Sequence, residues 1–268
     1  MKVTGLRGST VASWSVCRKV LRIEIIIHTR FDYYSFNAVK RQEDEEGLRK
    51  AAKWIHNLIE KEITESNISS DRIVVGGISQ GGAVSLLTGL TTERPLAGIF
   101  CLSTYIPLRS KVPEVSNLCF QSFLKISQSD PRLQFATAQA RTLPILWCHG
   151  NIDMKMDVDV WKDLAETLAG QLGIPFRTST ENSTASRKLD DDSDWKNYVM
   201  DLARDLGIES PAGLNSTSAN HSSVNELLLV ERGKGELHFR TYRGLGHKLD
   251  DKELRDLALW LSTLIPPA

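Results

Sequence analysis

Apolar residues recur along the chain in two kinds of pattern, and the order of the two predicts an α/β protein. Residues 44–63 carry apolar side chains at spacings of three and four, which predicts an amphipathic helix, and helices are also expected over residues 158–172 and 249–264. Short apolar runs lie between them, and the nearly continuous run at residues 96–103 is typical of a parallel strand covered on both faces. The expected strands are residues 72–76, 96–103, 143–150 and 236–242. Strands that alternate with helices predict a doubly wound, mostly parallel sheet.

The first 29 residues do not follow this alternation. They have no clear period except for a β-branched run at residues 20–27, which predicts a strand. We therefore expect an atypical N-terminal segment, residues 1–29, followed by one α/β domain, residues 30–268.

A second departure lies at residues 177–234. Two patches rich in Ser, Thr and Asn flank an acidic stretch at residues 190–194, and this composition predicts a surface insertion that is partly disordered. Ser193 or Asp194 is expected to cap a short helix that reaches about Leu206. The acidic stretch is then the solvated start of that helix, with a docking element as the alternative.

The composition is that of an ordinary globular protein, with 41% hydrophobic and 25% charged residues. The 33 basic and 33 acidic residues balance, so we expect no nucleic-acid partner, which a clustered basic excess would indicate. No apolar run reaches the roughly 18 residues of a transmembrane helix, and the first residues lack the apolar core of a signal peptide, so no stable membrane insertion is expected. Cys101 and Cys148 lie in apolar, strand-like runs and are expected to be buried thiols, which fits a reducing compartment.

The strongest chemical signal is Gly77-Ile78-Ser79-Gln80-Gly81, a G-x-S-x-G sequence between an expected strand and an expected helix. In this context the pentapeptide is typical of a nucleophile elbow, the sharp turn that exposes a reactive serine. Small residues are needed two positions before and after the serine, because the strand and helix backbones approach closely there. Gln80 would offer its backbone N–H to a developing oxyanion. The alternative is an ordinary Gly-rich turn or a phosphate cradle, but a P-loop needs a Lys after its glycines and none follows here.

A nucleophilic Ser79 needs a base and an orienting carboxylate, in the chain order Ser, acid, His. Asp153 follows the strand expected at residues 143–150 and would lie at the carboxyl edge of the sheet, where ligand crevices form in open α/β sheets. Asp157 is the rival, but it is also placed to cap the helix that follows. We therefore expect Asp153 to be the acid.

Six histidines compete for the role of base. His247 lies in a loop with glycines between an expected strand and an expected helix, and such a loop can bring the imidazole back toward Ser79. The other five precede the serine, lie within a strand, sit in a tight turn beside a glycine, or belong to the polar insertion: His28, His56, His238, His149 and His221. We therefore expect His247 to be the base.

Together these segments resemble the acyl-protein thioesterase and lysophospholipase family of α/β hydrolases, also called the phospholipase/carboxylesterase family. The nucleophile segment, residues 71–83, is similar to that of the family, with Ile78 where Phe is usual. Arg30 stands where the family has the Trp of a Trp-Phe-Asp segment. The other similar segments are residues 43–48, 96–108, 145–153 and 244–247. The resemblance covers roughly residues 30–176 and 235–266.

The resemblance implies an α/β-hydrolase fold and a serine hydrolase without a cofactor, and the scattered His and Asp residues lack the spacing of a metal site. Ser79 would be the nucleophile, Asp153 would orient His247, and His247 would act as base and then as acid. Gln80 would supply one oxyanion N–H.

Family members remove palmitoyl groups from S-acylated proteins, such as G-protein alpha subunits or Ras-like GTPases, and cleave some lysolipids and small acyl esters. A cytoplasmic location is expected, with the nucleus as a second one.

The resemblance also implies an acyl channel beside the expected strand at residues 96–103. Apolar residues there would help to line it, with ordinary loop packing as an equal alternative: Leu102, Tyr105, Ile106 and Leu108.

Two features depart from the family pattern. The His-Gly-x-Gly-Asp segment, whose backbone supplies the second oxyanion N–H, does not occur, and several dozen residues are missing before Arg30. Losing one oxyanion donor typically costs about 10²–10³ in rate. The family's first core strand, which precedes that segment, is missing as well, and the run at residues 20–27 could replace it. We interpret residues 1–29 as a rearranged or wrongly predicted N-terminus of an ordinary family member. The insertion, which lies between acid and base, is the second departure.

Three functions remain open on the sequence alone. The leading one is a serine hydrolase of S-acylated proteins or lysolipids. A catalytically impaired member that binds acyl chains or partners is the alternative from another class, because the oxyanion segment is absent. A broad carboxylesterase for small esters is the third.

Overall fold

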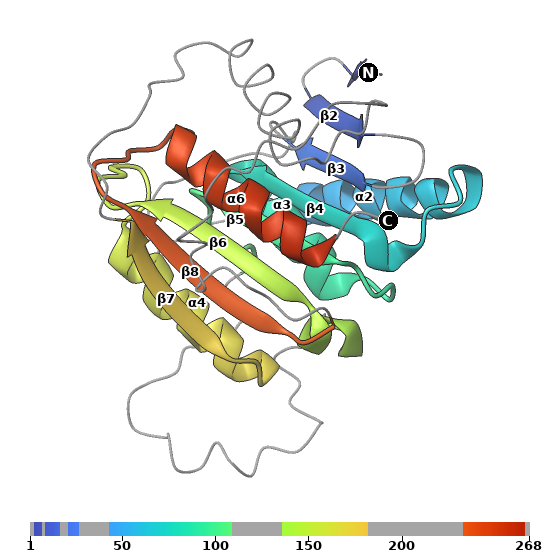
Figure 1. Cartoon of the computed structure of the whole chain (residues 1–268). Coiled ribbons are helices and arrows are strands. Elements are labelled where there is room, and N and C mark those ends of the chain that lie inside the picture. The colour runs from blue at the N-terminus through green and yellow to red at the C-terminus, as the bar shows by residue number, and fades with distance from the viewer. Residues whose placement is uncertain are drawn as a thin grey trace, which may run out of the picture.

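The structure, a computed structural model, describes residues 3–6, 9–16, 21–26, 43–108, 136–181 and 233–265. An eight-stranded sheet runs through its centre in the order β1-β2-β3-β4-β5-β6-β8-β7 (Figure 1). Neighbouring strands from β3 to β7 are parallel, whereas β1 and β2 are antiparallel to their neighbours at one edge. The strands are β1 (Val3–Leu6), β2 (Ser9–Val16), β3 (Leu21–Ile26), β4 (Ile73–Ile78), β5 (Gly98–Leu102), β6 (Pro144–Gly150), β7 (Phe176–Glu181) and β8 (Glu236–Tyr242).

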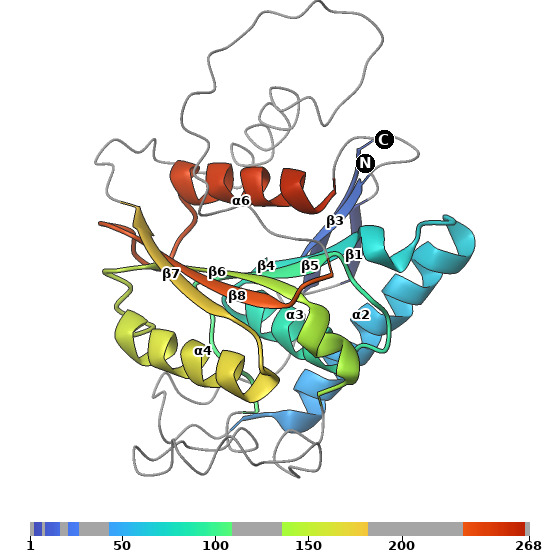
Figure 2. The same ribbon diagram turned by 60° about the horizontal axis from the view of Figure 1, so that its bottom comes forward.

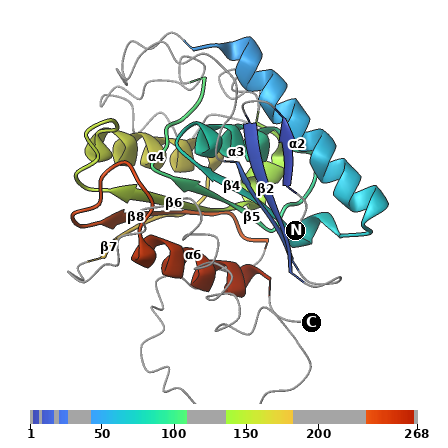
Figure 3. The ribbon, with the colours of Figure 1, turned by 90° about the horizontal axis from the view of Figure 1, so that it is seen from above.

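Helices cover both faces of this sheet. α6 (Asp251–Leu264) lies on one face, whereas α3 (Gln80–Thr91) and α4 (Val158–Leu172) lie on the other (Figures 2 and 3). α2 (Glu45–Glu65) packs against α3. Two short 3₁₀ helices, η1 (Ser70–Arg72) and η5 (Ala138–Thr142), precede β4 and β6. The doubly wound, mostly parallel sheet expected from the sequence is confirmed.

Aspartates set the starts of three helices. The side chain of Asp44 accepts the N–H of Gly47 at the start of α2, and Asp157 accepts two N–H groups at the start of α4. Asp250 does the same for α6. A carboxylate at this position satisfies N–H groups that have no partner within the helix, so these caps explain where the helices begin.

β5 shows why its apolar run is continuous. Its successive side chains point to opposite faces, so Ile99 and Cys101 join the core beneath α2, α3 and α4. Phe100 and Leu102 join the second core, which includes Trp260 of α6. Both faces of the strand are buried, as the run at residues 96–103 predicted.

The β-branched run near the N-terminus is a strand, as predicted. β3 lies parallel to β4, with Ile25 opposite Gly76 and Ile26 opposite Gly77. β3 therefore occupies the position beside the strand that leads to Ser79. The hairpin of β1 and β2 before it was not predicted, because its short segments show no clear period.

The expected start of the insertion at residue 177 is wrong. Residues 177–181 belong to β7, which pairs along its length with β8 as the edge strand of the sheet. Its polar residues suit this position, because an edge strand that is covered on one face keeps polar side chains on the other. Residues 182–232 of the expected insertion, which include the acidic stretch and the expected helix to Leu206, lie outside the described residues, as does the segment around Arg30.

Within the described ranges, no helix has the length and apolar character that crossing a membrane requires. The same part of the chain holds no group of three or more His, Cys, Asp or Glu side chains that could bind a metal ion. Cys101 and Cys148 are buried free thiols, as expected, and burial raises the pKa of both.

Candidate active site

Ser79 occupies a strained turn between β4 and α3. Its backbone has φ 55° and ψ −119°, a conformation that is uncommon for a residue with a side chain. The Ser79 N–H donates to the carbonyl of Leu102 at 2.8 Å. Its own carbonyl accepts from the N–H of Ala83 at 3.1 Å and from Thr104 Oγ1 at 2.5 Å. Three hydrogen bonds, from the end of β5, the loop after it and α3, therefore hold the serine in this conformation.

Close backbone packing explains a glycine that follows the turn. A Cβ at Gly82 would lie 2.7 Å from Thr104 Cβ and 2.8 Å from the carbonyl oxygen of Gly77. The sequence predicted a need for small residues at Gly77 and Gly81, but it did not single out Gly82. The helix can follow the serine this closely only because Gly82 has no side chain.

The structure brings the three residues expected to carry the chemistry into one hydrogen-bonded chain. Ser79 Oγ lies 3.0 Å from His247 Nε2, and His247 Nδ1 lies 2.8 Å from Asp153 Oδ2. These three residues come from the turn after β4, the loop after β8 and the loop after β6. Because the strands are parallel, all three loops leave the same edge of the sheet. The arrangement can deliver the hydroxyl proton of Ser79 to an imidazole whose other nitrogen is held by a carboxylate.

Asp153 is fixed from both sides. Its Oδ1 accepts the N–H groups of Lys155 at 2.9 Å and Met156 at 3.1 Å, which leaves Oδ2 for His247. Its side chain is fully buried. The rival, Asp157, instead accepts the N–H groups of Asp159 and Val160 as the cap of α4. The geometry therefore selects Asp153 as the partner of His247.

The loops that carry Asp153 and His247 are joined directly to each other. The N–H of Asn151 donates to the carbonyl of Tyr242 at 3.0 Å, and the N–H of Ile152 donates to the carbonyl of Leu245 at 3.1 Å. The side-chain oxygen of Asn151 accepts the N–H of Gly244 at 2.7 Å. Asn151 thus joins the two loops, a contact that the sequence did not reveal, because its partners lie more than ninety residues away.

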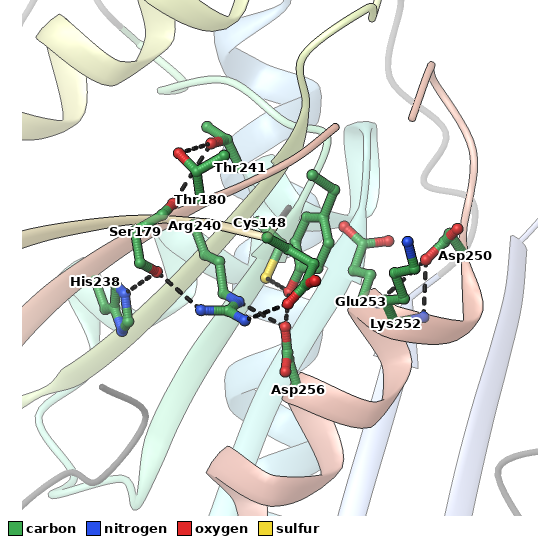
Figure 4. Close-up of polar contacts among 12 residues, drawn as sticks. Cys148, Ser179, Thr180, His238, Arg240, Thr241, Asp250, Lys252, Glu253 and Asp256 are labelled. Atoms are coloured by element: carbon green, nitrogen blue, oxygen red, sulfur yellow. Dashed lines mark hydrogen bonds and ion pairs between the residues drawn. The ribbon is translucent and has the colours of Figure 1, made fainter. Parts of the chain in front are cut away.

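A buried polar network joins β7, β8 and α6 (Figure 4). Arg240 of β8 donates through Nε to Asp256 Oδ2 of α6 at 2.5 Å, and the hydroxyl of Tyr242 donates to the same oxygen at 2.9 Å. Arg240 also reaches Ser179 and Glu181 of β7. Burial raises the pKa of Asp256, although Arg240 opposes this. The network ties together the strand before His247 and the helix after it.

Glu253 lies beside this network on the first turn of α6. The side chain is 0% exposed, and neither carboxyl oxygen has a hydrogen-bond partner in the described part of the chain. Burial raises the pKa of Glu253 well above its ordinary value, and Asp250, Asp256 and Asp153 add to this effect. Burial therefore favours the protonated form of this carboxyl group.

Three other histidines lie in the described residues, and the ring of each has a hydrogen-bond partner other than Ser79. His56 Nε2 lies 3.1 Å from the carbonyl of Thr88, and His238 Nε2 lies 2.7 Å from Ser179 Oγ. His149 Nε2 lies 3.2 Å from the carbonyl of Met156. His28 and His221 fall outside the described residues.

The four residues expected to line an acyl channel are buried. Tyr105, Ile106 and Leu108 belong to the core beneath α2, α3 and α4, and Leu102 belongs to the core beneath α6. Each is at most 3% exposed. This burial agrees with the packing alternative, and a role in acyl binding stays a prediction.

Gln80 is the first residue of α3. The first N–H groups of a helix have no partner within it, and they point out of its N-terminus. The Gln80 N–H therefore stands at the positive end of the helix dipole, directly after Ser79. Its use as an oxyanion donor stays a prediction.

The sequence of this chain is similar to those of known hydrolases. A sequence model described as Phospholipase/Carboxylesterase matches residues 28–139. The chain is 33% identical over 151 residues to acyl-protein thioesterase 1 of Mycosarcoma maydis, a match that covers 54% of this chain and 55% of that protein. It is 40% identical over 119 residues to acyl-protein thioesterase 1 of Neurospora crassa, which covers 44% of this chain and 41% of that protein. The chain thus spans about half the length of the curated relatives it matches.

A solved structure supports the fold. Acyl-protein thioesterase 2 of Zea mays superposes with a TM-score of 0.50 and 17% sequence identity, over 88% of this chain and 72% of that one. At this identity the likeness concerns the fold alone.

Proposed function

We propose that this chain, which belongs to the phospholipase/carboxylesterase family of α/β hydrolases, is a serine hydrolase that removes fatty acyl groups from cysteine side chains of proteins. The observation that carries the proposal is the hydrogen-bonded chain of Ser79, His247 and Asp153. The names of the relatives, acyl-protein thioesterase 1, support the substrate class.

In the proposed reaction His247 Nε2 takes the proton of Ser79 Oγ while that oxygen attacks the thioester carbonyl carbon. Asp153 holds His247 Nδ1–H and stabilises the imidazolium that forms. The Gln80 N–H supports the oxyanion. His247 then returns the proton to the departing cysteine sulfur, which leaves an acyl ester on Ser79. Water activated by His247 attacks this ester in turn and releases the fatty acid.

The proposed substrates are S-palmitoylated proteins, and lysolipids or other acyl esters are included because their carbonyl carbon accepts the same attack. We also propose that the protein is located in the cytoplasm and the nucleus, which the distribution of a fluorescent fusion of the full chain would test.

Covalent labelling with a fluorophosphonate tests the proposed nucleophile. We expect one adduct on Ser79, located by mass spectrometry of the digested protein, and none in Ser79→Ala. A folded sample that takes up no label would contradict the proposal.

Turnover separates the proposed function from its alternatives. A palmitoyl-thioester peptide should be cleaved with a higher kcat/KM than a short p-nitrophenyl ester, and Ser79→Ala should abolish both activities. The opposite preference would indicate a broad carboxylesterase. Acyl binding without turnover, unchanged in Ser79→Ala, would indicate an acyl-binding protein.

A further inference from the structure

His149 lies beneath the loop that carries Asp153. It is the last residue but one of β6 and is 0% exposed. Its ring stacks on Phe239 of β8, with ring centroids 6.1 Å apart and an interplanar angle of 15°. The ring is therefore fixed in place by the sheet before it makes any polar contact.

The polar contacts of His149 converge on the turn of Asp153. His149 Nε2 lies 3.2 Å from the carbonyl oxygen of Met156. A carbonyl oxygen only accepts, so this nitrogen carries the proton. The N–H of the same Met156 donates to Asp153 Oδ1 at 3.1 Å. Met156 thus links His149 to the carboxylate through both polar groups of its backbone.

His149 also approaches the carboxylate itself. Its Nε2 lies 3.6 Å from Asp153 Oδ2, the oxygen that faces His247 Nδ1. The titratable groups that act on His149 are Asp153, Asp157 and His247. Burial lowers the pKa of His149, although Asp153 opposes this. A neutral imidazole here presents an N–H to the turn and leaves the negative charge of Asp153, which faces His247, without a competing positive charge.

We propose that His149 is a positioning residue for the reaction of Ser79: its Nε2–H anchors the turn from Asp153 to Met156, and this keeps Asp153 Oδ2 against His247 Nδ1. The inference rests on the proposed function. It assigns the histidine of the His149-Gly150 pair a role beyond core packing, and it concerns the rate of the chemical step.

Two substitutions separate the hydrogen bond from the packing. His149→Phe keeps an aromatic ring against Phe239 but removes the donor, whereas His149→Gln keeps a donor N–H near the position of Nε2. We expect kcat of His149→Phe to fall by a factor on the order of 10², the scale that follows from a misplaced catalytic group, with KM unchanged. His149→Gln should restore most of the loss. Full kcat in His149→Phe, or an equal loss in both variants, would overturn the proposal.

His56 offers a matched control. Its Nε2 makes a contact of 3.1 Å with the carbonyl of Thr88, between α2 and α3 and away from the loop of Asp153. His56→Phe and His56→Gln should leave kcat unchanged. An equal loss in His56→Phe and His149→Phe would reduce the effect to general destabilisation and overturn the proposal.

A spectroscopic measurement reports the geometry without turnover. The proton shared by His247 Nδ1 and Asp153 Oδ2 should give a low-field NMR resonance, assigned by its loss in His247→Gln. We expect this resonance to disappear in His149→Phe and to persist in His149→Gln. If circular dichroism shows that His149→Phe is unfolded, His149→Met, which also lacks the donor, takes its place. A persistent resonance in the donor-free variant would overturn the proposal.

The two proposals fail in different ways. A folded wild-type chain without hydrolase activity contradicts the proposed function. An active wild type whose His149→Phe variant keeps the same kcat contradicts the role of His149 alone.

Discussion

Gly150 and Leu245 touch backbone to backbone. A Cβ on Gly150 would lie 2.1 Å from the carbonyl oxygen of Leu245, and that same oxygen accepts the N–H of Ile152 at 3.1 Å. Gly150 ends β6, three residues before Asp153, and Leu245 lies two residues before His247. This contact therefore sets how far apart the two loops hold the carboxylate and the imidazole.

Gly150→Ala should impair catalysis by moving the two loops apart. A methyl group cannot fit against the Leu245 carbonyl, so His247 should shift relative to Asp153. We expect kcat to fall by a factor on the order of 10². The free energy of unfolding should fall by about 1–3 kcal/mol, the usual cost of overpacking. Steady-state kinetics and urea denaturation measure the two effects.

Gly170 is the matched control for this substitution. It lies in α4, and a Cβ there would meet no atom within 4 Å. Gly170→Ala should leave kcat unchanged and stabilise the protein by up to about 1 kcal/mol, because alanine favours the helix. Wild-type kcat in Gly150→Ala would show that the loop contact does not govern the site.

Thr104→Val should weaken the hold on the strained serine. Thr104 Oγ1 donates to the Ser79 carbonyl at 2.5 Å, and valine keeps the shape while it removes the donor. We expect a loss of about 1 kcal/mol of stability and a several-fold fall in kcat, because the Ser79 backbone is freer to relax. The rate of fluorophosphonate labelling should fall with kcat.

Thr137→Val removes a similar bond elsewhere. Thr137 Oγ1 donates to the carbonyl of Thr92 at 2.5 Å, away from the turn of Ser79. Its loss should cost similar stability but leave the labelling rate unchanged. If both variants label at the wild-type rate, the Thr104 bond has no role in presenting the serine.

Local patterns in the sequence predicted the backbone of the site, because strands, helices and the elbow depend on residues close together in the chain. β8 and α4 have the predicted bounds. Asp153 and His247 were chosen because each lies in a loop that follows an expected strand, at residues 143–150 and 236–242. β7 was missed, since its run of Ser and Thr resembles a loop and only its pairing with β8 makes it a strand.

Contacts between distant segments were not predictable in the same way. Gly150 ends a strand that the sequence predicted and Leu245 lies in an expected loop, but only the fold brings the two together and makes the glycine necessary. His149 was placed in a tight turn beside a glycine, and although Met156 is only seven residues away, no sequence pattern shows that Met156 links His149 to Asp153. Buried partners such as Arg240 and Asp256 can be recognised only after strand and helix are packed together.

The ion pair of Arg240 and Asp256 should matter most when one partner is lost. Both residues are buried, so Asp256→Leu leaves the guanidinium without its nearest carboxylate. We expect each single variant, Asp256→Leu or Arg240→Met, to lose about 3–5 kcal/mol in the free energy of unfolding. Urea denaturation at neutral pH measures this loss.

The double variant, Arg240→Met with Asp256→Leu, serves as the control for this pair. It removes both charges together, so it should be more stable than either single variant. Losses that simply add would show that the two side chains do not depend on each other.

His238 should make the protein less stable in acid. Burial first, and then the charges of Arg240 and Arg177, lower the pKa of His238 from its ordinary value of 6.5 to about 4. Between these two pH values the unfolded chain binds a proton that the folded chain does not, so the free energy of unfolding falls as the pH drops from about 6.5 to about 4. At about 1.4 kcal/mol for each unit, the loss from this group reaches about 3 kcal/mol.

The difference between His238→Gln and the wild type isolates this effect from the carboxyl groups that titrate in the same range. Glutamine can keep a hydrogen bond to Ser179 but has no proton to gain. Urea denaturation from pH 7.5 down to pH 4 should therefore show the variant gaining about 3 kcal/mol relative to the wild type, with the change confined to the range below about pH 6.5. A difference that stays constant over this range would mean that His238 takes up its proton as readily in the folded chain as in the unfolded one.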